Sequence, residues 1–428
     1  MKRGLFILLI HLFASASFFL ATIIVARYLG PEDFGDFSAA YSVAVVAYII
    51  CLLGADMTAI NVIATAVKAR EEGVIKAFII YVFAVVALLS IVYYMIVFIG
   101  YFVAKDILYF KDNHPVFVAV LFIPFMALTF FFYRVIISFS MPVFANILFK
   151  ALIHFSMLLL ASLMFYDEFF RDSHIAVVLF MIPWILSLCI MALFLFKKMK
   201  IFVCNPQKIE YVEWLSSGLS GLPYTLALIA IPYLSIIGAE VFLSNEESVG
   251  VFATIIALSH LIASNFSACI QSVDLEPIAE ALYDRKFKVV RRIFNRNTLN
   301  VTLLSLILVE ITLLYGKEIL SIYGEEYMVG NEILLIFIIM QCVVLMGCLA
   351  APTLIFMRKN KFVASSSLLL IVLLLVSISI FGYFYQETGI ALSVLFSVAF
   401  VFSMQILYAY KLTHNGVKIA ERQHFYWD

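Results

Sequence analysis

The chain begins with an apolar run, LFILLIHLFASASFFLATIIVAR, at residues 5–27, and a second run, FSAAYSVAVVAYIICLLGADMTAINVIATA, follows at residues 37–66. A transmembrane helix needs about 20 predominantly apolar residues, so each run is long enough to cross a bilayer. The break between them carries Gly30, Pro31 and three acidic residues. The two runs therefore predict two membrane spans joined by a short polar loop.

The same pattern continues to the end of the chain. Apolar runs separated by charged or turn-rich breaks predict twelve spans in all, at residues 5–27, 37–66, 75–103, 116–137, 145–166, 174–196, 215–242, 249–272, 298–315, 332–357, 363–384 and 387–411. Every intervening loop is short, which leaves no room for a folded domain outside the membrane. The sequence predicts an all-α integral membrane protein of about 12 transmembrane helices.

The composition agrees with this class. Of 428 residues, 65% are hydrophobic and 13% are charged, whereas soluble proteins carry about 45–50% apolar and about 25% charged residues. A soluble enzyme, a nucleic-acid-binding protein and a secreted disulfide scaffold are therefore excluded. The six cysteines form no CxxC pair and lie mostly within apolar runs, so they indicate neither a disulfide framework nor a zinc site.

The basic residues define the orientation. With the N-terminus inside, 23 of the 28 Lys and Arg residues fall in inner segments, and the outer segments hold only Arg27, Lys105, Lys111, Arg171 and Lys317. Cytoplasmic loops are enriched in Lys and Arg. We therefore expect both termini on the cytoplasmic side and an even number of spans.

An internal repeat relates the two halves. A shift of 215 residues pairs Glu32 with Glu247 and Gly35 with Gly250, and both copies begin in an outer loop after the first span of a half. Six spans per half give the halves the same topology, so a pseudo-two-fold axis along the membrane normal relates them. We expect an N-terminal six-helix lobe at 1–196, a cytoplasmic inter-lobe linker at 197–214 and a C-terminal six-helix lobe at 215–428.

Few ionisable residues lie within or at the ends of the spans, where a charge costs about 2.5–3.5 kcal/mol and normally faces a cavity or a partner. Asp56 and Glu310 lie inside spans, and His260 lies in the eighth span. Arg27 ends the first span on the outer side, whereas Arg134 and Lys150 lie at inner ends. Snorkelling to lipid headgroups is the alternative explanation for the three cations, and hydrogen-bonded packing is the alternative for the histidine.

Three segments carry a resemblance to a known family. The segment ARYLGPEDFG at 26–35 resembles the opening signature of bacterial polysaccharide flippases, the Wzx-type O-antigen translocases of the MATE-like multidrug/oligosaccharidyl-lipid/polysaccharide exporter superfamily. The segment ESVGVFA at 247–253 is similar to the matching part of the second half, and Pro277-Ile278-Ala279 also fits. The resemblance implies a V-shaped bundle of two lobes.

The resemblance also implies a function. Such a protein moves an undecaprenyl-diphosphate-linked oligosaccharide, an O-antigen or other surface polysaccharide unit, across the bacterial cytoplasmic (inner) membrane by alternating access during lipopolysaccharide biosynthesis. Arg27, Arg134 and Lys150 are then candidates for binding the diphosphate, and His260 and Asn265 for contacting sugars. Asp56 or Glu310 is a candidate carrier of a coupling proton or sodium ion. No catalytic residue, metal or other cofactor is expected, and the expected partners are the lipid-linked glycan, the bilayer and the polysaccharide polymerase and chain-length machinery, with no nucleic acid.

Two other functions fit parts of the sequence. A multidrug or organic-cation antiporter of the same superfamily would use Asp56 and Glu310 to attract cations. A membrane glycosyltransferase or O-antigen polymerase would need paired acids on the outer side, but the pair Asp274 and Glu276 falls at the cytoplasmic end of the eighth span. The lack of a large outer loop also argues against a polymerase.

Overall fold

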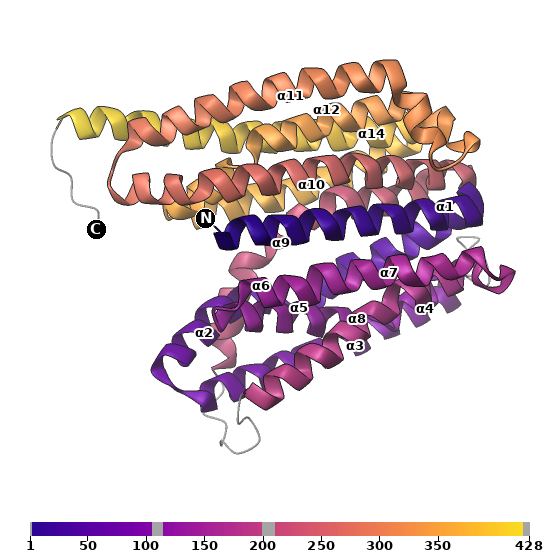
Figure 1. The fold of residues 1–428 in the computed structure, drawn as a ribbon, viewed down its shortest axis with the longest axis horizontal. Helices are drawn as coiled ribbons and strands as arrows, with labels where there is room; N and C mark the ends of the chain where they lie inside the picture. The colour runs from indigo at the N-terminus through magenta and orange to yellow at the C-terminus, as the bar shows by residue number, and fades with distance from the viewer. Residues whose placement is uncertain (1, 105–113, 199–209, 423–428) are drawn as a thin grey trace. The chain divides into compact units, whose positions relative to one another are not determined.

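A computed structural model describes residues 2–104, 114–198 and 210–422 (Figure 1). Every regular element in these ranges is helical, as the sequence predicts. Nine helices in the described residues are long and apolar enough to cross a membrane, and the shorter helix α5 (Ile123–Ser138) is also apolar. The protein is therefore a multi-pass membrane protein.

The twelve predicted spans are confirmed, because two of the long helices each contain two spans. The helix α1 (Lys2–Cys51) bends at Gly30, whose φ of 76° and ψ of 172° are not helical, and α2 (Ala55–Ala69) continues the second span. The helix α14 (Asn360–Arg422) breaks in the same way at Gln386, between the predicted eleventh and twelfth spans. Both breaks lie where the sequence predicts a loop, but the loops are nearly absent.

The remaining elements follow the predicted order. They are α3 (Glu72–Ala104), α4 (Val116–Val120), α5 (Ile123–Ser138), α6 (Pro142–Asn146), the π-helix η1 (Ile147–Leu152), α7 (Ile153–Ala161), α8 (Ser173–Lys198), α9 (Tyr211–Phe242), α10 (Glu246–Tyr283), α11 (Phe287–Ser321), α12 (Asn331–Gly347) and α13 (Ala350–Phe356). Short 3₁₀ segments lie at Ser162–Phe165, Glu168–Phe170 and Glu325–Gly330.

The chain divides into two compact units, Met1–Ala253 and Thr254–Asp428, and the division falls inside α10. The first unit thus contains the six spans of the predicted N-terminal lobe together with α9. Most of the predicted inter-lobe linker, residues 199–209, lies outside the described residues. The lobes at 1–196 and 215–428 stay a prediction.

Aromatic side chains build much of the core of the first unit. Phe37 of α1 packs edge-on against Phe180 of α8 with ring centroids 4.9 Å apart, and Phe78 of α3 meets Trp214 of α9 in the same way at 5.1 Å. Edge-to-face pairs of this kind add about 0.5–1.5 kcal/mol beyond the area that they bury. These contacts fix α1, α3, α8 and α9 around one interior.

Glycines allow α9 and the start of α10 to approach α1 and α2 closely. A Cβ on Gly218 of α9 would collide with the carbonyl oxygen of Leu53, and a Cβ on Gly250 of α10 would collide with that of Pro31. A Cβ on Gly35 would lie 3.0 Å from the Gly250 nitrogen. The two glycines that the repeat matches, Gly35 and Gly250, therefore lie against each other.

The second unit is held together by aliphatic packing. Ile278 of α10, Val290 and Ile293 of α11, and Leu349, which precedes α13, form one buried cluster. The helices α11 and α14 lie beside α12 (Figure 1). The outer faces of these helices expose leucines such as Leu306 and Leu407, at 63% and 69% exposure, as expected for surfaces that contact lipid.

Candidate functional site

Asp56 lies in the first turn of α2, directly after the left-handed residues Leu53 and Gly54. The side chain is 1% exposed, and neither carboxylate oxygen has a hydrogen-bond partner among the described residues. The positive end of the α2 dipole favours a negative charge at this position. The predicted intramembrane carboxylate is therefore buried inside the first unit.

Arg134 of α5 is the cation beside this carboxylate. A guanidinium nitrogen of Arg134 lies 3.9 Å from Asp56 Oδ2, at the long limit of an ion pair. The guanidinium also lies over the rings of Phe130 and Tyr133, with 5.0 and 5.7 Å from its carbon to the ring centroids. The Tyr133 hydroxyl in turn donates a hydrogen bond to Asn146 Oδ1 at 3.4 Å. The ion pair with Asp56 argues against the alternative that Arg134 only extends towards the lipid headgroups.

Lys150 sits on the π-helix η1, a rare element that is frequent at functional sites. Its carbonyl oxygen accepts a hydrogen bond from His154 Nδ1 at 2.7 Å, and its ammonium lies 5.7 Å from the Phe149 ring centroid. The Phe149 ring, next to Lys150 in the chain, stacks on the ring of Tyr133, the residue before Arg134, with centroids 4.5 Å apart. The structure thus brings three of the predicted residues, Asp56, Arg134 and Lys150, into one polar group.

The other predicted substrate residues belong to other elements of the chain, Arg27 to α1 and His260 and Asn265 to α10. Arg27 is exposed near the end of the first half of α1. The ring of Phe18, also on α1, contacts the ring of His154, whose Nδ1 is hydrogen-bonded to the Lys150 carbonyl. Arg27 lies nine residues further along α1 than Phe18, or about 13 Å of helix rise. His260 and Asn265 belong to α10 in the second unit, where the Asn265 amide donates to the Leu261 carbonyl at 2.9 Å and its buried Oδ1 accepts no hydrogen bond within the described residues.

Glu310 occupies an exposed position on α11, in the second unit. Its neighbours along the helix include Ile307, Leu313 and Leu314, which are 54%, 61% and 62% exposed. The structure therefore places Glu310 on an exposed, mostly apolar face of α11 and in a different unit from Asp56.

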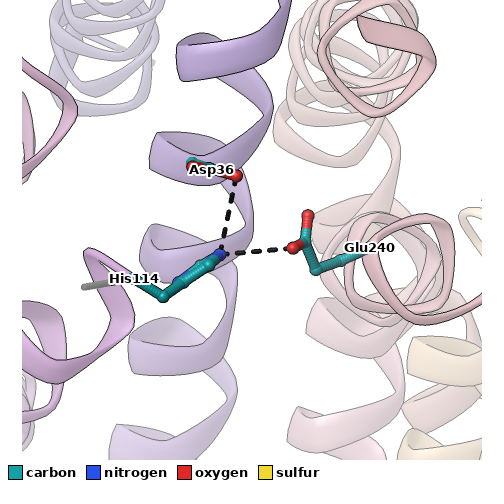
Figure 2. Close-up of side chains that lie close together, drawn as sticks. All are labelled: Asp36, His114 and Glu240. Carbon is teal, nitrogen blue, oxygen red and sulfur yellow. Dashed lines mark hydrogen bonds and ion pairs between the residues drawn. The ribbon is translucent and has the colours of Figure 1, made fainter. Parts of the chain in front are cut away.

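A second polar group, which the sequence did not predict, lies where the second half of α1 begins, near the end of α9. His114 Nε2 lies 3.2 Å from Glu240 Oε1 and 3.7 Å from Asp36 Oδ1 (Figure 2). The histidine ring points between α1, which carries Asp36, and α9, which carries Glu240 (Figure 2). The side chains of His114 and Asp36 are 5% and 11% exposed, and that of Glu240 is 26% exposed. We call these three residues the outer cluster, because the predicted topology puts all of them on the outer side.

The hydrogen bonds of His114 define its resting state. Its Nδ1 accepts a hydrogen bond from the backbone N–H of Val116 at 3.1 Å, so in the neutral ring Nε2 carries the proton and donates a hydrogen bond to Glu240. A metal ion on Nε2 would shift that proton to Nδ1 and remove the Val116 contact. Losing that contact would cost about 0.5–1.5 kcal/mol, the usual contribution of one hydrogen bond. The Val116 contact therefore does not prevent metal binding.

The outer cluster leaves little trace in the sequence. Asp36, His114 and Glu240 are separated by more than 70 residues each and have no motif spacing. The sequence shows only that each of the three residues lies at or next to the outer end of a predicted span. Only a packed arrangement of α1, α4 and α9 brings them together.

Comparison with known proteins gives structural relatives only. No family model matches the chain, and no curated protein matches its sequence. Among solved structures, an inward-facing multidrug resistance MATE family transporter of the MOP superfamily aligns with a TM-score of 0.79 at 12% identity, over 94% of this chain and 96% of that one.

Two further solved structures support the same fold. A MOP superfamily transporter from Pyrococcus furiosus aligns with a TM-score of 0.64 at 13% identity, over 98% of this chain and 97% of that one. A variant of the Vibrio cholerae MATE transporter VcmN aligns with a TM-score of 0.64 at 16% identity, over 97% of each chain. The fold is therefore the MATE-like fold of MOP superfamily transporters, and the predicted fold class is confirmed.

Proposed function

We propose that this protein is a flippase that moves an undecaprenyl-diphosphate-linked oligosaccharide from the inner to the outer leaflet by alternating access. One observation supports an anionic substrate. The polar group inside the first unit contains two cations, Arg134 and Lys150, and one carboxylate, Asp56. Its charge therefore favours a diphosphate over an organic cation.

The geometry suggests a role for each of these residues. The planar guanidinium of Arg134 suits two phosphate oxygens at once, and the Lys150 ammonium adds a second charge-assisted contact. A diphosphate bound to Arg134 competes with Asp56, whose ion pair at 3.9 Å is already long. Release from Arg134 leaves the Asp56 carboxylate buried without a counter-charge, and it then takes up a proton or a sodium ion. Substrate binding and ion binding are linked through this exchange.

The remaining candidates have less specific support. Arg27 is proposed as an outer contact for the diphosphate, and His260 and Asn265 as sugar contacts from the C-terminal lobe. Glu310 remains an alternative ion carrier, although its exposed position on α11 makes Asp56 the stronger candidate. Inner-membrane location, cytoplasmic termini and contacts with polymerase and chain-length proteins belong to the same proposal.

The main alternative is a multidrug antiporter, because one of the structural relatives is a multidrug resistance transporter. An organic-cation site needs acidic groups that outnumber the cations around them. Asp56 is instead paired with Arg134, and Glu310 occupies an exposed position on α11. We therefore place the antiporter second.

A leaflet assay tests the proposed function. In a strain that lacks the gene, lipid-linked oligosaccharide should accumulate in the inner leaflet, and expression of this chain should restore it to the outer leaflet. Resistance to organic cations should not change in either strain. Full-length surface polymer in the deletion strain, or a change in drug resistance alone, would contradict the proposal.

A further inference from the structure

We propose that Asp36, His114 and Glu240 form a binding site for a transition-metal dication of the Zn²⁺ class. The ligand set carries the chemistry, because one imidazole and two carboxylates are ligands that zinc uses in proteins. Asp36 belongs to α1, His114 lies two residues before α4, and Glu240 belongs to α9. A bound ion would therefore join three segments that are remote in sequence. This inference is independent of the proposed transport function.

The distances fit a tetrahedral ion. Zinc–nitrogen and zinc–oxygen bonds of about 2.0–2.2 Å place neighbouring ligand atoms about 3.4 Å apart. The Nε2–Glu240 and Nε2–Asp36 distances are 3.2 and 3.7 Å, and all three ligand atoms lie within 4.8 Å of one another. A small rotation of one carboxylate closes the remaining gap. Three protein ligands leave the fourth position for water.

Burial and access also fit. His114 and Asp36 are almost fully buried, which fixes their side chains, while Glu240 is partly exposed, so an ion could reach the site from the Glu240 side. Glu240 lies two residues before the end of α9, and Asp36 lies six residues after the bend at Gly30. The ion would therefore tie the outer end of α9 to the start of α1's second half.

The chain provides a matched control. His174 Nδ1 lies 3.4 Å from Asp172 Oδ1, a second histidine–carboxylate pair on the predicted outer side. That pair is more exposed and belongs to no group of three metal-binding side chains within the described residues. A His174→Gln variant therefore removes a histidine without removing the proposed site.

Metal titration of the purified full-length protein, carrying no histidine tag, tests the proposal. One Co²⁺ per chain should give the intense visible absorption of tetrahedral cobalt, and Zn²⁺ should displace it. His114→Gln and Glu240→Gln should each weaken Zn²⁺ binding by at least about tenfold, while His174→Gln should bind like wild type. Glu240→Asp, which keeps a carboxylate, should retain part of the affinity.

The same titration can overturn the inference. Wild-type protein that gives only the weak absorption of hydrated Co²⁺ would show that the outer cluster is a hydrogen-bonded group and no metal site. Equal Zn²⁺ affinity in wild type, His114→Gln and Glu240→Gln would have the same meaning. Monodisperse gel filtration of each variant shows that lost binding does not result from lost folding.

Discussion

Asp56→Asn and Arg134→Gln should each reduce export of lipid-linked oligosaccharide by about tenfold or more, and combining the two substitutions should not restore it. A hydrogen bond to a charged group contributes about 1.5–3 kcal/mol, and each 1.4 kcal/mol is about tenfold in an equilibrium. Arg134→Gln removes the proposed phosphate ligand, and Asp56→Asn removes the proposed ion carrier. The leaflet assay at matched membrane abundance measures both.

Thermal stability distinguishes this role from a structural one. Removing one partner of a buried ion pair costs up to about 3–5 kcal/mol, because the partner left behind must stay buried as an unpaired charge or be neutralised by a proton. Arg134→Gln should therefore destabilise the protein more than Asp56→Asn does, since Asp56 is 1% exposed and Arg134 is 23% exposed. The double variant should regain stability but not export. Recovery of both would make the pair structural, and Asp172→Asn, at an exposed pair, is the neutral control.

The sequence was sufficient for the spans because each is a long apolar run between polar breaks. It also placed Asp56 at membrane depth, since Gly54, Ala55 and Asp56 lie well within such a run. It did not indicate the partner of Asp56. Arg134 lies 78 residues away on α5, and only the packing of α2 against α5 places the two side chains together.

Glu310 illustrates a different limit. A span assignment gives the depth of a residue but not the face of the helix on which it lies. On α11 the buried positions include the small or polar residues Asn297, Ser305, Thr312 and Gly316, which follow one stripe. Glu310 lies about 140° around the helix from Ser305, at 100° per residue. The helical spacing of these small and polar residues therefore predicts that Glu310 lies on the opposite face of α11.

The close contact between Gly250 and Pro31 predicts the largest effect on folding. Gly250→Val should reduce the amount of monodisperse protein in detergent extracts to a small fraction of wild type and lower the melting temperature of what remains. The new Cβ would collide with a backbone carbonyl oxygen, which cannot rotate away as a side chain can. Relief requires α10 to move from the bend of α1, and such overpacking costs about 1–3 kcal/mol or more.

Gly100→Ala provides the control for this prediction. Gly100 lies in α3, and a Cβ there would meet no atom within 4 Å. Alanine in a helix is favoured over glycine by about 0.5–1 kcal/mol, so this variant should match or exceed the wild-type melting temperature. If Gly250→Val and Gly100→Ala behave alike in fluorescence-detected gel filtration and thermal unfolding, the contact between α1 and α10 is not needed for folding. A loss confined to Gly250→Val would show that the glycines matched by the repeat hold the two halves of the sequence in contact at this end.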